Sequence, residues 1–109
     1  MRLPNNTLID PEKLTGYLLV FKKHNDKSRW LAKAGYTLET WQVLQDDLRK
    51  QFKFTDAEFI EITEYGKMYQ IKGKLKGPNK IGLCVSTIWI IESNTGISKF
   101  VTMYPDKKK

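Results

Sequence analysis

Three short turn segments in the C-terminal half restrict this 109-residue chain to a small set of folds. They separate four stretches rich in β-branched and aromatic residues, at 59–64, 67–75, 80–92 and 97–104. The separators are Tyr65-Gly66, Gly77-Pro78-Asn79 and Ser93-Asn94-Thr95-Gly96, and each contains residues that tight turns require. Because parallel strands need long crossover connections, three successive short turns predict a four-stranded antiparallel meander.

The N-terminal half carries helical patterns instead. Asp10-Pro11-Glu12 is typical of a helix start, and apolar residues then recur at helical spacing. A short second helix is predicted from Asp26 to Gly35, and Thr37 is predicted to cap a third. The apolar stripes of the first and third helices are Leu14, Tyr17, Leu18 and Phe21, and Leu38, Trp41, Leu44, Leu48 and Phe52.

Helices followed by strands predict an α+β fold, in which two or three N-terminal helices pack on one face of the sheet. We expect one domain, with a helical part at 10–52, a sheet part at 59–104 and a basic tail at 105–109. Alternation in the strands predicts that Thr87 and Trp89 share one face of the third strand, and that Phe100, Thr102 and Tyr104 share one face of the fourth.

Composition excludes several classes of protein. Cys84 is the only cysteine, so no intramolecular disulfide forms, and one cysteine with one histidine cannot build a zinc site. We therefore expect neither a metal nor another cofactor. No apolar run reaches the length of about 20 residues that a membrane span needs, and the first ten residues lack the pattern of a signal peptide. These features predict a cytoplasmic protein that does not enter a membrane.

The net charge of +7 is unevenly distributed. Residues 22–33 carry a net +4 and residues 65–109 a net +7, whereas residues 39–64 between them carry a net −4. If the two basic blocks share a face, that face attracts a polyanion, with RNA as the favoured partner. The alternative is a solvated lysine surface without a ligand.

His24, Lys27 and Arg29 form a compact cluster in the connection between the first two predicted helices. An unperturbed histidine titrates near neutral pH and can therefore move a proton. Lysine and arginine neutralise phosphate, and arginine can engage two oxygens at once. The cluster thus has the groups that a phosphate site needs, although each residue also suits a solvated loop.

Short motifs of one recognisable order run through nearly the whole chain. They are Leu3-Pro4-Asn5, Asp10-Pro11-Glu12-Lys13-Leu14, Tyr17-Leu18-Leu19, Lys27-Ser28-Arg29, Tyr36-Thr37, Trp41, Glu64-Tyr65-Gly66, residues 75–79, Thr87-Ile88-Trp89-Ile90 and Phe100-Val101-Thr102. This order resembles a bacterial domain family of unknown function, whose members occur as small stand-alone proteins and at the ends of phage head-morphogenesis and other polymorphic-toxin proteins. The resemblance implies a toxin effector with nuclease activity, and the layout is similar to the small ribonuclease toxins of the RelE and colicin D types.

These observations lead to the hypothesis of a metal-independent ribonuclease. His24 would act as base or acid, and Lys27 and Arg29 would stabilise charge on the phosphate. The resemblance also extends to Thr87 and Thr102, which would orient the phosphate or ribose. The residues predicted to bind the substrate are Lys72 and Lys74, on the exposed side of the second strand, and Trp89 or Tyr104, which would stack on a base.

The sequence also leaves open a function without catalysis. Thr87 is also a good strand former, and Trp89 in an apolar strand is also typical of a core. A module that binds nucleic acid, or an antitoxin or immunity partner, without catalysis is therefore the alternative. An antitoxin or immunity protein itself is disfavoured, because proteins that neutralise a basic nuclease are often acidic.

Overall fold

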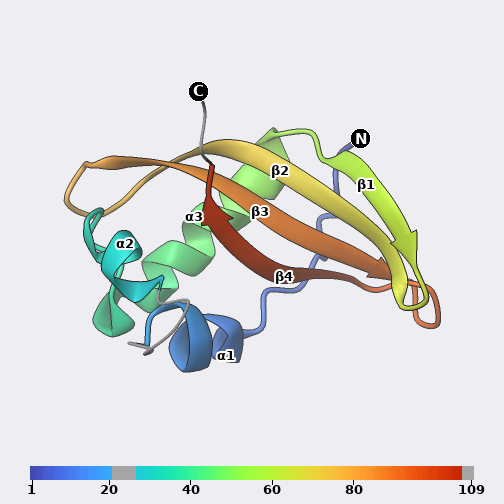
Figure 1. Cartoon of the computed structure of the whole chain (residues 1–109), viewed down its shortest axis with the longest axis horizontal. Coiled ribbons are helices and arrows are strands. Elements are labelled where there is room, and N and C mark those ends of the chain that lie inside the picture. Colours follow the sequence, from blue (N-terminus) through green and yellow to red (C-terminus); the bar gives the residue numbers. More distant parts are fainter. Residues whose placement is uncertain (21–26, 107–109) are drawn as a thin grey trace.

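The computed structural model describes residues 1–20 and 27–106 (Figure 1). Four antiparallel strands form one sheet in the order β1-β2-β3-β4. They are β1 (Glu58–Thr63), β2 (Gly66–Lys76), β3 (Gly82–Glu92) and β4 (Ser98–Pro105). Each strand begins and ends within two residues of its predicted limits, and helices precede the sheet. The predicted α+β fold with an antiparallel meander is therefore confirmed.

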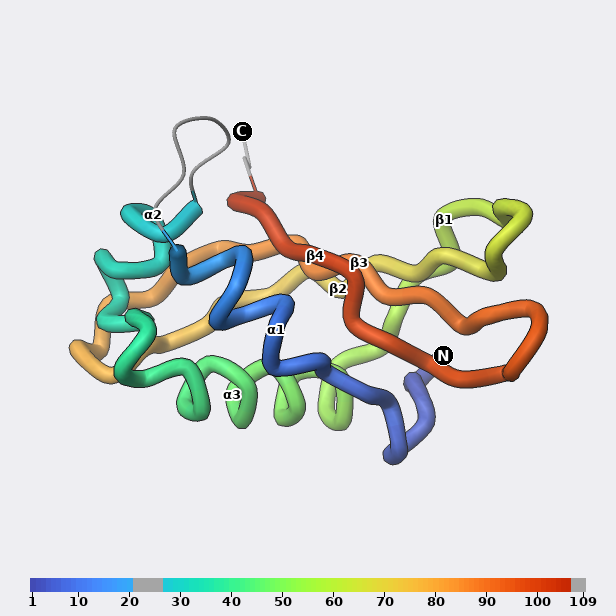
Figure 2. The backbone as a smooth tube through the Cα atoms, turned by 90° about the horizontal axis from the view of Figure 1, so that it is seen from below, coloured from blue at the N-terminus to red at the C-terminus, as the bar shows by residue number. Residues whose placement is uncertain are grey.

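The helix α3 (Trp41–Phe54) covers one face of this sheet, which we call the core face. Its residues Leu44, Leu48 and Phe52 have no exposed surface, as the predicted apolar stripe requires. The Phe52 ring meets the ring of Trp89 edge-on at a centroid distance of 5.4 Å. Figure 2 shows α3 running along one side of β2 and β3. The prediction that Leu38 belongs to this apolar stripe is wrong. Leu38 is 47% exposed and lies in the short 3-10 helix η2 (Leu38–Thr40) before α3.

A bulge in β4 changes the predicted faces of that strand. Trp89 pairs with Phe100, but the next residue back, Ile88, pairs with Thr102, so Val101 is an extra residue. Phe100 therefore lies on the core face, whereas Thr102 lies on the opposite face. The prediction that Phe100 and Thr102 share a face is wrong, because simple alternation does not include an inserted residue.

The first helical segment begins as predicted and then widens. Asp10 caps α1 (Pro11–Lys13), and its side chain accepts a hydrogen bond from the Glu12 N–H at 3.0 Å. The chain continues as the π-helix η1 (Leu14–Leu18), which is closed by a 2.9 Å bond from the Leu19 N–H to the Leu14 carbonyl. This wider turn leaves Tyr17 63% exposed, so its predicted place in the apolar stripe is wrong. The predicted stripe residue Phe21 lies outside the described residues.

The helix α2 (Ser28–Ala32) lies beside the turn that joins β2 to β3 (Figure 1). The Asn79 N–H donates to the Ala34 carbonyl at 3.3 Å, and Gly77 approaches the same carbonyl. The predicted cap Asp26 lies outside the described residues. Within residues 1–20 and 27–106, no helix is long and apolar enough to cross a membrane.

The N-terminal segment covers part of the outer edge of β4. Leu8 forms a parallel bridge with Lys99. Its N–H donates to the Ser98 carbonyl, and its carbonyl accepts from the Phe100 N–H, both at 2.8 Å. Among the described residues, strand edges without a paired strand therefore lie on β1, on the part of β2 that extends beyond β1, and on the part of β4 beyond the Leu8 bridge.

Candidate functional site

The face of the sheet opposite α3, which we call the open face, brings together several of the polar residues singled out in the sequence. Residues paired across antiparallel strands point to the same face. Lys72, Ser86 and Tyr104 form one row across β2, β3 and β4, and Gln70, Ile88 and Thr102 form the adjacent row. Lys74 pairs with Cys84 in the row beyond Lys72. The open face thus carries two of the predicted lysines beside two predicted hydroxyl groups.

A contact between Lys27 and Thr102 connects α2 to this face. The Lys27 ammonium donates to the Thr102 hydroxyl at 3.4 Å, although the two residues are 75 positions apart in the sequence. Partial burial lowers the pKa of Lys27, because desolvation disfavours the charged ammonium. The structure therefore places one cation of the predicted cluster next to one of the predicted strand threonines.

Tyr104 reaches across β3 on the same face. Its hydroxyl lies 3.3 Å from the side-chain oxygen of Gln70, and these residues belong to strands on either side of β3. Ser86, the cross-strand neighbour of Tyr104, is only 1% exposed, and its hydroxyl has no hydrogen-bond partner within residues 1–20 and 27–106. An unpaired buried hydroxyl is uncommon in folded proteins, and it marks the centre of this face as a polar position without a structural explanation.

Thr87 and Trp89 lie on the core face and not on the open face. Both side chains have no exposed surface. The Trp89 indole N–H donates to the Thr87 hydroxyl at 2.8 Å, and that hydroxyl has the Gln51 side-chain oxygen and the Ile71 carbonyl as acceptors, each at 3.2 Å. This bonding is complete within the core. Neither a phosphate-orienting role for Thr87 nor a base-stacking role for Trp89 fits this placement, because α3 separates both from solvent.

The remaining predicted site residues are Lys72, Lys74, Arg29 and His24. Lys72 and Lys74 are exposed on β2. Arg29 is exposed on α2, two residues after Lys27, and residues at this spacing do not face each other on a helix. His24 lies outside the described residues. Among the residues that are described, no three His, Cys, Asp or Glu side chains are grouped as metal ligands.

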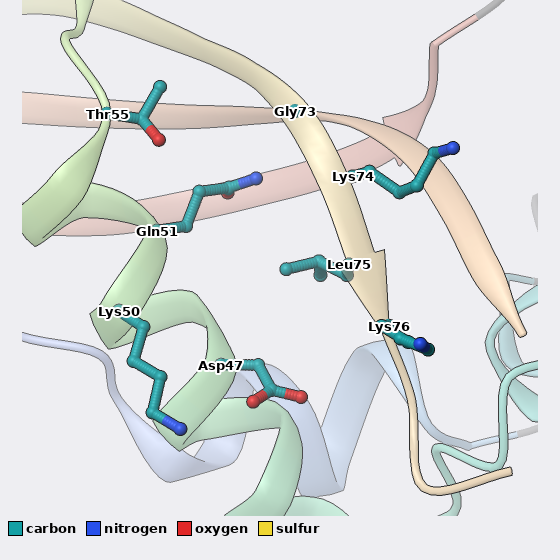
Figure 3. Close-up of a pocket in the computed structure, with 8 residues that line it drawn as sticks. All are labelled: Asp47, Lys50, Gln51, Thr55, Gly73, Lys74, Leu75 and Lys76. Atoms are coloured by element: carbon teal, nitrogen blue, oxygen red, sulfur yellow. The ribbon is translucent and has the colours of Figure 1, made fainter. Parts of the chain in front are cut away.

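A second polar region, which the sequence reasoning missed, lies between α3 and β2 (Figure 3). It is a cavity of about 290 Å³. Gln51 is 8% exposed, and its amide nitrogen has no hydrogen-bond partner among the described residues. The sequence contains a signal for this polar region. Gln51 follows Leu48 by three positions and therefore places a polar residue on the apolar side of α3. The residues around the cavity are Asp47, Lys50, Gln51, Thr55, Gly73, Lys74, Leu75 and Lys76.

Comparisons with known proteins support one part of the resemblance, namely that the chain belongs to a domain family of unknown function. The chain belongs to the family described as a domain of unknown function, DUF6883, whose sequence model matches residues 2–107. No curated protein sequence matches this chain significantly. Its fold is similar to that of a chain in a contact-dependent growth inhibition toxin–immunity protein complex from Klebsiella pneumoniae 342. That match has a TM-score of 0.69 at 16% sequence identity, and covers 92% of this chain and 100% of the other.

Proposed function

We propose that this DUF6883 domain is a toxin-type, metal-independent ribonuclease whose site lies on the open face. The observation that carries the proposal is the contact of Lys27 with Thr102, which places a partly desolvated ammonium beside a hydroxyl on a lysine-bearing sheet face. A cation in a partly desolvated position interacts more strongly with a phosphate than one in bulk water. The fold shared with a chain of a toxin–immunity complex supports the toxin setting.

The proposed reaction needs no group beyond the chain, the RNA and solvent water. The ribose 2′-oxygen bonds to the adjacent phosphorus, the bond from phosphorus to the 5′-oxygen breaks, and a 2′,3′-cyclic phosphate and a 5′-hydroxyl remain. His24 accepts the 2′-proton, and solvent water donates a proton to the 5′-oxygen. Lys27 stabilises the charge that develops on the phosphate oxygens, and Thr102 orients the phosphate.

Binding of the RNA strand follows from the layout of the open face. Lys72 and Lys74 attract the flanking phosphates, and the exposed part of the Tyr104 ring stacks on a base. Glu58 and Glu61 pair with Gln70 and Met68 and so occupy the β1 side of the same face. These carboxylates repel RNA, so we expect the strand to lie toward the turn between β2 and β3.

The experiment that tests this function is induced expression in a bacterial host, with growth and total RNA followed together. Wild type is expected to arrest growth and fragment RNA, and Lys27→Ala is expected to do neither. Lys53→Ala removes the same charge from an exposed position on α3, behind the sheet, and should behave like wild type. Normal growth and intact RNA with soluble, folded wild-type protein would refute the proposal, as would fragmentation by Lys27→Ala at the wild-type level.

A partner-binding module is the second candidate, and the unpaired edge of β2 beside α3 favours it. Such a protein would bind RNA, if at all, with steep salt dependence and would leave it intact. It would also copurify with a partner without arresting growth.

A further inference from the structure

Part of β2 presents an unpaired strand edge. β1 pairs with β2 only from Gly66 to Gln70, whereas β3 pairs with β2 along its whole length. On the side away from β3, no described strand pairs with Ile71–Lys76. Six residues of extended chain span about 20 Å, which is a typical length for one added strand. Exposed edges of this kind are templates for pairing with another chain.

The cavity of about 290 Å³ between α3 and β2 lies along this edge (Figure 3). Gly73 widens it, because a Cβ atom at that position would lie only 2.8 Å from the Gln51 amide nitrogen. The cavity and the Ile71–Lys76 edge together form what we call the β2 groove. At one end the groove meets the start of β1, and at the other it meets the turn that packs against Ala34.

An unsatisfied donor points into the β2 groove. The Gln51 side chain is directed from α3 toward Gly73 (Figure 3), and its oxygen already lies within bonding distance of the Thr87 hydroxyl. Its amide nitrogen is buried and has no hydrogen-bond partner in the part of the chain that the structure describes. A backbone carbonyl in a strand placed along β2 is an acceptor of the kind that this nitrogen lacks.

The charges around the groove favour an acidic occupant. Lys72, Lys74 and Lys76 alternate along β2, and Lys74 and Lys76 point to the side away from α3 in Figure 3. Lys50 adds a cation on the α3 side. Asp47 is the single carboxylate among the described residues that line the groove. It accepts a 2.6 Å hydrogen bond from Tyr36, whose pKa is raised by burial and by this contact.

Two other occupants fit the β2 groove less well than an acidic peptide does. A second copy that paired through the same edge would bring two rows of lysines together, and like charges opposite each other destabilise a strand pair. A nucleic acid would satisfy the lysines, but it offers no strand backbone to the edge of β2. An extended acidic peptide satisfies the lysines, the edge and the Gln51 amide at once.

We propose that the β2 groove binds an acidic, extended segment of a partner protein, which adds a strand to the sheet beside β2. Acidic residues at alternate positions of that segment contact Lys72, Lys74 and Lys76, and a backbone carbonyl accepts the Gln51 amide N–H. This inference does not depend on ribonuclease activity. If that activity exists, the segment would also neutralise lysines that bind RNA and would thereby inhibit the protein.

The test is titration of the isotope-labelled full chain with designed peptides, followed by NMR. The probe is a seven-residue peptide of alternating glutamate and valine. One matched control replaces the glutamates by lysines, and another places proline at the centre, where it disrupts strand pairing. We expect the glutamate peptide alone to shift the amide signals of Ile71–Lys76 and the side-chain amide of Gln51.

Charge reversal provides the second arm. Lys74→Glu/Lys76→Glu should weaken binding of the glutamate peptide at least about tenfold and favour the lysine peptide, since like charges across a strand pair repel. The matched double variant Lys13→Glu/Lys53→Glu, which changes two helix lysines, should bind like wild type. No binding at millimolar peptide, equal binding of the proline control, or shifts of these amides by a single-stranded RNA oligonucleotide but by no peptide would each overturn the proposal.

Discussion

Lys27 combines a stability cost with a proposed function. Burial lowers the pKa of Lys27, so the folded protein holds this proton less tightly than the unfolded chain does. Between the lowered pKa and the ordinary lysine pKa, the unfolded state binds more protons, and the contribution of Lys27 to stability therefore rises with pH. At neutral pH the desolvated ammonium opposes folding, which is a common property of functional positions.

Replacement of this ammonium is therefore expected to separate stability from function. Lys27→Met keeps the length of the side chain and removes the charge, so the urea midpoint at pH 7 should be equal to or higher than that of wild type, while RNA fragmentation is lost. The difference in urea midpoint between Lys27→Met and wild type should decrease as the pH rises toward the ordinary pKa of lysine. A lower midpoint at pH 7, measured by circular dichroism, would show instead that Lys27 stabilises the fold.

Thr87 has the opposite role at the residue scale, since it supports the core. Thr87→Val keeps the shape but leaves the buried Trp89 indole N–H without its acceptor, and this should destabilise the protein by about 1–3 kcal/mol. Urea unfolding measures the loss. RNA cleavage per folded molecule should stay at the wild-type level at low temperature. A loss of cleavage without a loss of folded protein would show that Thr87 takes part in the reaction.

At the scale of elements, local signals in the sequence predict where the strands begin and end better than they predict which face of the sheet each residue occupies. Turn residues such as Tyr65-Gly66 mark the strand ends, because their backbone requirements are local. Alternation correctly groups Thr87 with Trp89, but it does not say which face α3 covers, and it misses the bulge at Val101. Helical spacing likewise does not predict the π-helix η1, in which Tyr17 is exposed.

The candidate site was predictable only in part for the same reason. Lys27, Thr102, Lys72 and Lys74 have side-chain types that suit phosphate binding, and the sequence indicates each of them. Their grouping depends on a contact across 75 positions, which tertiary packing alone determines. Ser86 has no distinguishing feature in the sequence, because only the folded structure shows that its hydroxyl is buried and has no hydrogen-bond partner among the described residues.

The junction between α2 and the turn after β2 allows a prediction with two matched glycines. A Cβ at Gly77 would lie 1.8 Å from the Ala34 carbonyl oxygen, so Gly77→Ala must displace the turn from α2 and should lower stability by about 2 kcal/mol or more. Gly16→Ala places its Cβ in open space and should raise stability by about 0.4–1 kcal/mol. Equal urea midpoints for the two variants would contradict the packing described at Gly77.

At the scale of the whole molecule, the net charge of +7 predicts salt-dependent binding of RNA. If Lys72 and Lys74 contact phosphates, the plot of log K against log salt for single-stranded RNA should become less steep by about 0.7 for each lysine replaced by alanine. Lys53→Ala should leave the slope unchanged. Fluorescence anisotropy over a salt series measures these slopes, and identical slopes for Lys72→Ala/Lys74→Ala and wild type would place the RNA on another face.

The most direct measurement is cleavage of total bacterial RNA by the purified protein in excess EDTA, with the new RNA ends identified. Wild type is expected to cut RNA and leave 2′,3′-cyclic phosphates and 5′-hydroxyls, and Lys27→Ala is expected to be slower by about 100-fold or more. Lys53→Ala serves as the control for loss of charge. Intact RNA with folded wild-type protein, cleavage that requires a divalent metal, or an unchanged rate for Lys27→Ala would contradict a metal-independent ribonuclease site on the open face.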